Sequence, residues 1–228
     1  MKKSIIILAT FSIVNAKAQT LIGVNIDLGS SKIKSGIMYN LSPENVIGGN
    51  AIGLAINANF NTSKRFNPKL NLGYINKKST SVRELMYNDP NNVNNYIKEN
   101  LTTTTSINGL KLDVGVRFNI LNNKNKLFIE VSVCNNYILN IQNKRNTTGL
   151  GLSTSYNTNP SPPYYVSLPL GVGYNYNNMF SVAILYNPAL TYFEAYSQSN
   201  VTMTSLNLCY YLPILGNKKV KTEKVANP

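Results

Sequence analysis

Apolar and polar side chains alternate in residues 109–121, GLKLDVGVRFNIL, with Leu110 to Ile120 on one parity and Lys111 to Asn119 on the other. A period of two is typical of an extended strand with two unlike faces. Seven further segments share this pattern: residues 22–28, 52–60, 70–74, 127–133, 166–176, 180–186 and 206–214. No internal stretch rich in Pro or Gly divides the chain. The sequence therefore predicts one all-β domain of eight strands.

The connections between these segments alternate in length. Those at residues 61–67, 122–126 and 177–178 are short, whereas those at about 29–50, 77–106, 140–163 and 191–201 are long. An up-and-down barrel with tight turns at one end and free loops at the other gives this alternation, and it places both chain ends on the side of the short turns. We expect an eight-stranded antiparallel up-and-down barrel over residues 19–215.

Two kinds of barrel fit this pattern, a soluble secreted one with an apolar interior and a membrane one with an apolar exterior. The polar parity carries mostly Gly, Asn, Ser and Ala, and only 14% of the chain is charged. Small residues suit the crowded interior of a narrow eight-stranded barrel, and a water-facing sheet would carry more Lys, Glu, Gln and Thr. We therefore expect a transmembrane barrel, with a soluble binding module as the alternative.

The apolar parity is aliphatic in mid-strand and aromatic toward the strand ends, which is typical of the girdles that lie at the two membrane interfaces. The predicted girdle residues are Phe60, Tyr74, Phe118, Tyr174, Tyr176, Tyr186 and Tyr210. The lipid of an outer membrane is accordingly the first expected partner.

Charged residues on the polar parity are expected to point into the lumen and to form a polar network there. They are Asp27, Lys69, Lys111, Asp113, Arg117 and Glu130. Charges in a narrow, dry interior must pair. If Ile120 opposes Leu127 across the short turn, Arg117 faces Glu130, and we expect an ion pair between them. The network is expected to plug the lumen, because eight strands leave little bore; a conducting path is the alternative.

The two chain ends carry targeting and charge signals. Residues 1–18 have a charged start, an apolar run from Ile5 to Val14 and an A-x-A site, which predicts a secretory signal peptide cut after Ala18. Residues 216–228 are expected to form a basic periplasmic tail. The formal charge of the whole chain is +13, carried by basic pairs scattered at strand ends. No face collects these charges, so nucleic acid is not an expected partner.

Several kinds of chemistry are not supported by the residues. The chain contains no histidine, which removes Ser-His-Asp hydrolysis and most zinc or iron sites. Cys134 and Cys209 fall at different heights on strands that are not neighbours, so no disulfide is expected. No glycine-rich phosphate loop or closely spaced calcium ligands are present. We expect a protein that is not an enzyme and has no cofactor or metal.

The signal peptide, the eight alternating segments and the stretch YYVSLPLGVGYNY together resemble the small outer-membrane β-barrel proteins of Gram-negative bacteria. The resemblance is to the OmpA-type membrane domain and especially to the PorT-like group, whose Tyr-x-x-(Ile/Leu)-Pro-Leu strand is met at Tyr165, Leu168, Pro169 and Leu170. Because Pro169 cannot donate a ladder hydrogen bond, we expect irregular pairing there.

The resemblance implies an integral outer-membrane protein with both termini in the periplasm. Its expected role is structural or in surface interaction, with a periplasmic or cell-surface protein as a partner. A narrow porin, or a component of a secretion or transport complex, is the alternative. The fold alone does not fix an activity.

Overall fold

The computed structural model describes residues 20–34, 45–60, 62, 64–89, 92–121, 125–148, 152–160, 163–193 and 199–212. The predicted signal peptide and basic tail lie outside these residues, as does the end of the last predicted strand at Ile214. In the described part of the chain, no helix is long and apolar enough to cross a bilayer. The regular structure there is antiparallel β-sheet.

Ten strands follow one another along the chain. They are β1 (Leu21–Lys34), β2 (Asn45–Asn59), β3 (Phe66–Asp89), β4 (Asn92–Asn119), β5 (Lys126–Thr147), β6 (Ser153–Thr158), β7 (Tyr164–Ser167), β8 (Leu170–Tyr176), β9 (Phe180–Pro188) and β10 (Asn200–Tyr211).

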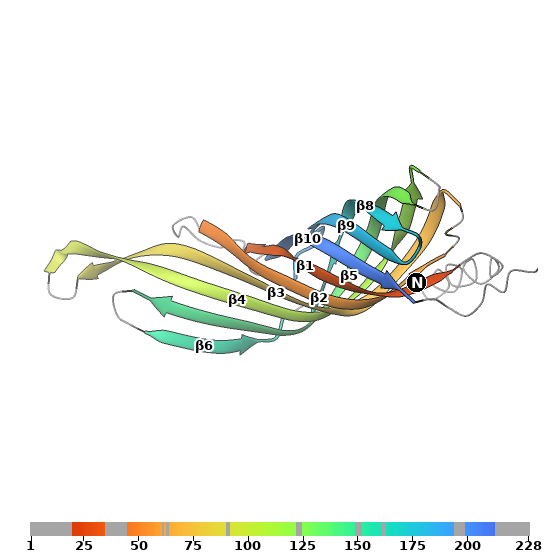
Figure 1. Ribbon diagram of the computed structural model, residues 1–228. Helices are drawn as coiled ribbons and strands as arrows, with labels where there is room; N and C mark the ends of the chain where they lie inside the picture. The colour runs from red at the N-terminus through yellow and green to blue at the C-terminus, as the bar shows by residue number, and fades with distance from the viewer. Residues whose placement is uncertain are drawn as a thin grey trace, which may run out of the picture.

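These strands close into a ring with eight positions (Figure 1). Each strand from β1 to β5 pairs with the next, β8 pairs with β9, β9 pairs with β10, and β10 pairs with β1. The short strands β6, β7 and β8 succeed one another along the same edge of β5, so together they fill the sixth position. The predicted eight-stranded antiparallel up-and-down barrel is confirmed.

Two of the predicted long loops are wrong, because most of residues 77–106 and 140–163 is strand. β3 and β4 stay paired as far as Asp89 and Asn92, and β5 continues to Thr147, where it pairs with β6. Figure 1 shows these parts extending well beyond the barrel. We call them the projecting sheet: the described parts of residues 78–106 and 142–158. Its two faces are mostly polar, as in the run Thr102–Thr105, so it lacks the apolar alternation that marks the other strands.

A β-bulge in β5 shifts the inward parity of that strand. Gly109 of β4 pairs with Ile138 and Asn108 pairs with Asn140, which leaves Leu139 as the extra residue. Ile138 and Ile141 are consequently both buried, although they are three positions apart.

Pro169 interrupts the sixth position between β7 and β8, as expected from its missing N–H. The ladder on β5 has the same register on both sides of the break, at Cys134–Ser167 and at Val131–Leu170. Across the break the backbone N–H of Ser132 donates to the carbonyl oxygen of Pro169 at 3.0 Å. The predicted strand 166–176 is therefore divided without a change of register.

The predicted short turn between β8 and β9 is built on Asn177 and Asn178, whose φ angles are 52° and 55°. Asparagine tolerates this left-handed region better than most residues. The N–H of Met179 donates to the carbonyl oxygen of Tyr176 at 2.9 Å, and the N–H of Asn178 donates to Asn175 Oδ1 at 2.9 Å. The two asparagines thus close a tight hairpin.

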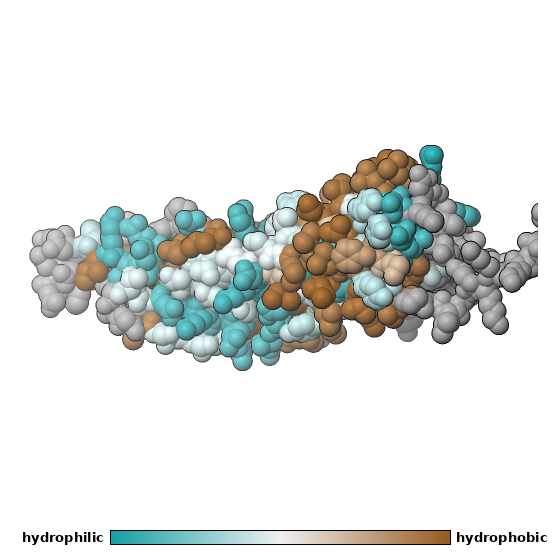
Figure 2. All heavy atoms as spheres, in the orientation of Figure 1, coloured by the Kyte–Doolittle hydropathy of each residue, from teal (hydrophilic) through white to brown (hydrophobic). Residues whose placement is uncertain are grey.

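The barrel has an apolar exterior and a polar interior. The side chains of Leu112, Val131 and Leu170 are exposed, with exposed fractions of 43%, 46% and 42%, whereas Lys111 and Glu130 are 6% and 5% exposed. Figure 2 shows hydrophobic residues gathered over the barrel and hydrophilic residues over the projecting sheet. This arrangement is the inverse of a soluble barrel, whose apolar side chains fill the centre.

Glycine on the inner face allows neighbouring strands to approach closely. A Cβ on Gly115 of β4 would lie 2.3 Å from Ser132 Cβ and from the carbonyl oxygen of Val131, both on β5. A Cβ on Gly73 of β3 would lie 2.2 Å from Ala55 Cβ on β2. The small residues on the polar parity therefore meet a steric need of the narrow interior.

Candidate functional site

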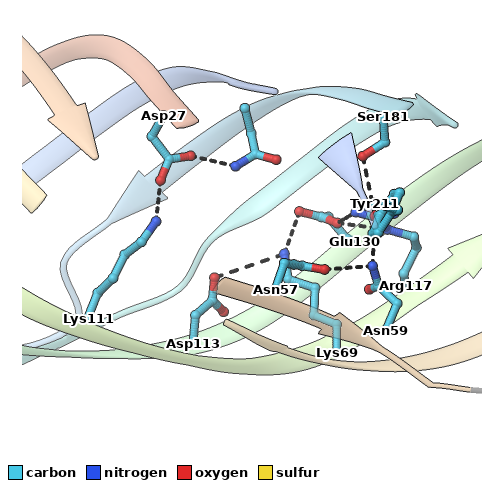
Figure 3. A network of polar contacts seen from close by, with 11 residues as sticks. Asp27, Asn57, Asn59, Lys69, Lys111, Asp113, Arg117, Glu130, Ser181 and Tyr211 are labelled. Atoms are coloured by element: carbon cyan, nitrogen blue, oxygen red, sulfur yellow. Dashed lines mark hydrogen bonds and ion pairs between the residues drawn. The ribbon is translucent and has the colours of Figure 1, made fainter. Parts of the chain in front are cut away.

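Glu130 is the centre of an ion network inside the barrel (Figure 3). Its Oε1 lies 2.6 Å from Lys69 Nζ of β3, and its Oε2 lies 2.9 Å from Arg117 Nη2 of β4. Arg117 Nε also donates to Oε2 at 3.1 Å, so two guanidinium nitrogens donate to the same carboxylate oxygen. Lys69 Nζ lies 3.9 Å from Asp113 Oδ2 as well. One carboxylate therefore joins three adjacent strands.

Tyr211 of β10 extends this network to the opposite part of the ring. Its hydroxyl accepts a hydrogen bond from Arg117 Nη1 at 3.0 Å and another from Asn59 Nδ2 at 2.7 Å. Asn59 Nδ2 also donates to Asn57 Oδ1 at 2.7 Å, and the Ser181 hydroxyl lies 3.4 Å from that of Tyr211. The network thus crosses the lumen from β4 and β5 to β2, β9 and β10.

A second cluster lies around Asp27 of β1. Its Oδ2 pairs with Lys111 Nζ of β4, and its Oδ1 accepts a hydrogen bond from Asn207 Nδ2 of β10 at 2.6 Å. β1 and β4 are not ladder neighbours. This ion pair therefore spans the interior and does not follow the wall.

All six predicted lumen residues are buried, and the structure brings them into these two clusters. Arg117 faces Glu130 in the ladder, and Lys111 pairs with Asp27 and not with the Glu130 group. Further members were missed because they carry no charge. They are Asn57, Asn59, Ser181, Asn207, Tyr211 and Phe128, and the ring centroid of Phe128 is 3.6 Å from Arg117 Cζ. The position of Phe128 on the polar parity is the one signal in the sequence that points to it.

Lys77 was also missed, because residues 77–106 were expected to form a loop. Its side chain is fully buried, and its Nζ donates to the Tyr165 hydroxyl at 2.5 Å. Nζ lies 5.1 Å from the centroid of the Tyr165 ring, so the ring faces this charge as well. The contact between Lys77 and Tyr165 lies at the boundary between the charged part of the lumen and an apolar part to which Tyr165 belongs.

The apolar part is a layer of buried side chains across the lumen at the end where the projecting sheet begins. We call it the apolar layer; it consists of Ile33, Ile107, Ile138, Ile141, Tyr165, Phe193 and Val201. Phe193 comes from the connection between β9 and β10, and its ring centroid lies 6.0 Å from that of Tyr165. Ions that enter this layer lose their hydration without gaining partners, so it opposes their passage.

The predicted girdle residues lie on the outer face, at two levels. Phe118, Tyr174, Tyr176 and Tyr210 are near the short connections, and Phe60 directly follows β2; the neighbouring ring of Phe66 lies 4.9 Å from that of Phe118. Tyr186 lies near the other end of β9. Tyr74 is not at a strand end, because β3 continues into the projecting sheet, but it shares a ladder row with Leu110, Tyr137 and Tyr164. Tyr137 and Tyr164 are exposed aromatics that the sequence pattern did not identify.

The thiols and acidic residues do not form a reactive centre in the described part of the chain. Cys134 and Cys209 are both buried and unbonded, in agreement with the sequence expectation. Among the described residues, no group of three or more Cys, Asp or Glu side chains could hold a metal ion. Chemically, the arrangement links strands to one another across the interior of the barrel.

Comparisons with known proteins give similarity at the level of architecture. No protein-family model and no curated protein match the chain. Solved outer-membrane β-barrels are similar in structure. Ail, the attachment invasion locus protein of Yersinia pestis, is 13% identical with a TM-score of 0.39, over 85% of this chain and 99% of that one. Neisserial surface protein A is 10% identical with a TM-score of 0.42, over 84% and 97%.

The outer membrane protease OmpT from Escherichia coli is 8% identical with a TM-score of 0.45, over 85% of this chain and 96% of that one. Values this low assign neither a family nor a role. The resemblance to the PorT-like group stays a prediction.

Proposed function

We propose that this chain is an integral outer-membrane β-barrel with a closed lumen, whose role is structural or in surface interaction. The observation that carries the proposal is the inversion of the barrel: aliphatic side chains cover its outside, while Lys69, Arg117 and Glu130 pair inside. Only hydrocarbon makes such an exterior favourable, and only a closed ring satisfies every backbone group there.

The proposed orientation is based on the sequence of the two chain ends. Residues 1–18 are proposed to act as a secretory signal peptide, and the short connections and both termini are proposed to face the periplasm. The projecting sheet would then stand on the cell surface. Its polar faces suit water, and its length offers an extended surface to a partner protein.

Membrane fractionation tests this proposal. The mature protein is expected in the detergent-extractable outer membrane, and its mobility in SDS gels is expected to change on heating, because a closed barrel resists the detergent until it is boiled. A protein found in the soluble fraction, with one mobility at all temperatures, would contradict the membrane assignment and favour a secreted binding module.

A narrow pore, or a part of a secretion or transport complex, is the second candidate. The charged lumen between Arg117 and Asp27 favours it, because mobile ions could follow such groups. The apolar layer opposes it. Planar-bilayer recordings separate the two: we expect no conductance steps from the purified barrel, whereas regular steps would favour the pore.

The basic tail, residues 216–228, is the proposed contact with anionic headgroups or a periplasmic partner, because its sequence contains four lysines within seven positions, Lys218, Lys219, Lys221 and Lys224. Deleting these residues is expected to remove a partner from pull-downs in mild detergent; an unchanged set of co-purifying proteins would contradict this contact. A role without catalysis is proposed because the chain contains no histidine.

A further inference from the structure

We propose that the outer face of the barrel, over β3, β4 and β5, binds one molecule of a phosphorylated glycolipid whose acyl chains are amide-linked to its sugar. Three features follow one another along these strands toward the projecting sheet: an apolar groove, a band of polar side chains and a pair of lysines. Each of them matches one part of such a lipid. The lipid would belong to the membrane leaflet on the side of the projecting sheet.

The apolar groove has a volume of about 430 Å³. The side chains that line it on the outer face are Leu72, Leu110, Leu112, Asn135, Tyr137 and Tyr164. Leu72 of β3 faces Leu112 of β4 in the ladder, and Leu112 in turn faces Asn135 of β5. Because a hollow in an apolar wall is filled most favourably by hydrocarbon, an acyl chain is the expected occupant.

Asn135 places one amide group in this apolar wall. Its side chain is on the outer face of β5, and among the described residues it has no hydrogen-bond partner. A polar group without a partner is costly in hydrocarbon. An amide side chain both donates and accepts hydrogen bonds. An amide-linked acyl chain offers it a carbonyl oxygen and an N–H, whereas an ester-linked chain offers acceptors alone.

The polar band lies between the groove and the lysines. Asn76, Ser106, Asn108 and Gln142 are its outward side chains. The Tyr74 hydroxyl donates to Asn108 Oδ1 at 2.9 Å, and Asn76 Nδ2 donates to the same oxygen. Four residues separate Tyr74 from Lys78, a rise of about 13 Å along the strand. That length accommodates a headgroup of two sugar rings, whose hydroxyl groups would meet these side chains.

Lys78 of β3 and Lys144 of β5 lie beyond the polar band, on either side of β4. Both are exposed, and they face adjoining positions of β4, Ser106 and Thr104. Among the side chains that the structure describes in the projecting sheet, the one outward carboxylate is that of Glu84, which pairs with Lys98 at 3.1 Å. The described residues therefore supply no anion to Lys78 or Lys144. A lysine is a suitable point charge for a phosphate group.

These features together select the class of lipid. A phosphatidylglycerol would satisfy the lysines and the groove, but its ester links and small headgroup would leave Asn135 and the polar band without matching groups. A zwitterionic phospholipid would also bring a cation of its own toward the lysines. A soluble sugar phosphate would leave the groove unfilled.

Native mass spectrometry of the full-length mature barrel, released from detergent, tests the proposal. The probes are diphosphoryl lipid A, phosphatidylglycerol, phosphatidylcholine and glucosamine 1-phosphate. We expect one saturable adduct of lipid A, with an affinity at least about tenfold above those of the two phospholipids, and no adduct of glucosamine 1-phosphate at the same concentration. The absence of a saturable lipid A adduct, or an equal affinity for phosphatidylglycerol, would overturn the proposal. Equally tight binding of glucosamine 1-phosphate would also overturn it, because the groove would then have no part.

Charge-matched variants locate the site. K78Q/K144Q is expected to weaken lipid A binding at least about tenfold, because the phosphate groups lose both cations. K64Q/R65Q removes the same charge from exposed positions in the short connection at the other end of the barrel. This control is expected to change the affinity by less than about twofold. Equal losses in the two double variants would overturn the proposal, because the effect would then come from net charge.

N135L tests the amide contact. Leucine suits a lipid-facing wall, so the variant is expected to form the heat-modifiable barrel. Its affinity for lipid A is expected to fall about fivefold, while that for phosphatidylglycerol changes by less than about twofold. Unchanged lipid A binding in N135L would overturn the choice of an amide-linked lipid. This variant also decides the matter if K78Q/K144Q does not form the barrel.

The inference rests on the proposed function, because it needs a bilayer around this wall. The two can fail separately. A protein that fractionates with the outer membrane but forms no lipid A adduct would remove this site alone, whereas a protein found in the soluble fraction would remove the membrane assignment itself.

Discussion

Arg117 and Glu130 face each other across the β4–β5 ladder, and both are buried inside the barrel, with Arg117 Nη2 2.9 Å from Glu130 Oε2. Glu130 also pairs with Lys69 at 2.6 Å. The carboxylate is thus shared by two buried cations, and removing one partner of such a group leaves a charge that neither water nor protein compensates.

E130Q is therefore expected to lower the free energy of unfolding by about 3 kcal/mol or more, because Arg117 would keep its buried charge without an anion and Lys69 would keep only Asp113 at 3.9 Å. Denaturant titration of the barrel in lipid vesicles measures the change. The matched control is E84Q, which breaks the exposed pair between Glu84 and Lys98 at 3.1 Å and is expected to cost less than about 1 kcal/mol. Similar losses in both variants would contradict a structural role for the lumen network.

L112R places a charge on the exposed apolar face of β4. We expect the free energy of unfolding in vesicles to fall by about 2–4 kcal/mol, because the charge must enter hydrocarbon. T102R puts the same side chain on the same strand within the projecting sheet, where water is available, and is expected to be nearly neutral. If both substitutions were tolerated alike, the apolar exterior would not be facing lipid.

G115A tests the close contact between β4 and β5. The added Cβ would lie 2.3 Å from backbone and side-chain atoms of β5, so we expect a loss of about 1–3 kcal/mol or a failure to form the heat-modifiable barrel. In G53A the nearest atom to the new Cβ is Asp27 Oδ2 at 3.1 Å, so a shift of only a few tenths of an ångström is needed and a smaller loss is expected. Gel mobility and denaturant titration compare the two, and the reverse order would refute this packing.

The two native thiols are expected to be free and protected. Mass measurement of the unreduced protein should show no disulfide. A maleimide should label Cys134 and Cys209 on the order of 100-fold more slowly in the folded barrel than after unfolding, since both are buried. S153C on the exposed start of β6 is the positive control, and it should react at once on intact cells if the projecting sheet lies outside. Fast labelling of the native thiols would contradict the proposed closed lumen.

The barrel could be predicted from the sequence because the membrane-facing strands need two unlike faces. The parity of Leu110 to Ile120, together with the short turn before Leu127, was enough to set Arg117 opposite Glu130. The projecting sheet could not be found in this way. Thr102–Thr105 and most of their partners on β3 and β5 are polar, both on the outer face and on the inner face, where a cavity lies between the strands.

The cross-lumen contacts were also beyond the sequence pattern. Tyr211 meets Arg117, and Asp27 meets Lys111, only because the ring closes with a particular stagger between β1 and β10. Alternation within a strand carries no information on that stagger. Phe193 was missed for a similar reason: it comes from a connection, and its place in the apolar layer depends on how that connection folds over the mouth.

The bulge at Leu139 separates two parts of β5 in which the alternation of inward and outward side chains is set independently. Before it, each added or lost residue would turn Leu127, Ile129 and Val131 toward the lumen and Glu130 toward hydrocarbon. Beyond Leu139, a residue added or lost changes only the positions that follow it. The side chains of β5 in the barrel wall would keep their inward or outward orientation. The end of β5 in the projecting sheet can therefore vary in length and sequence while the part within the barrel keeps its inward and outward positions.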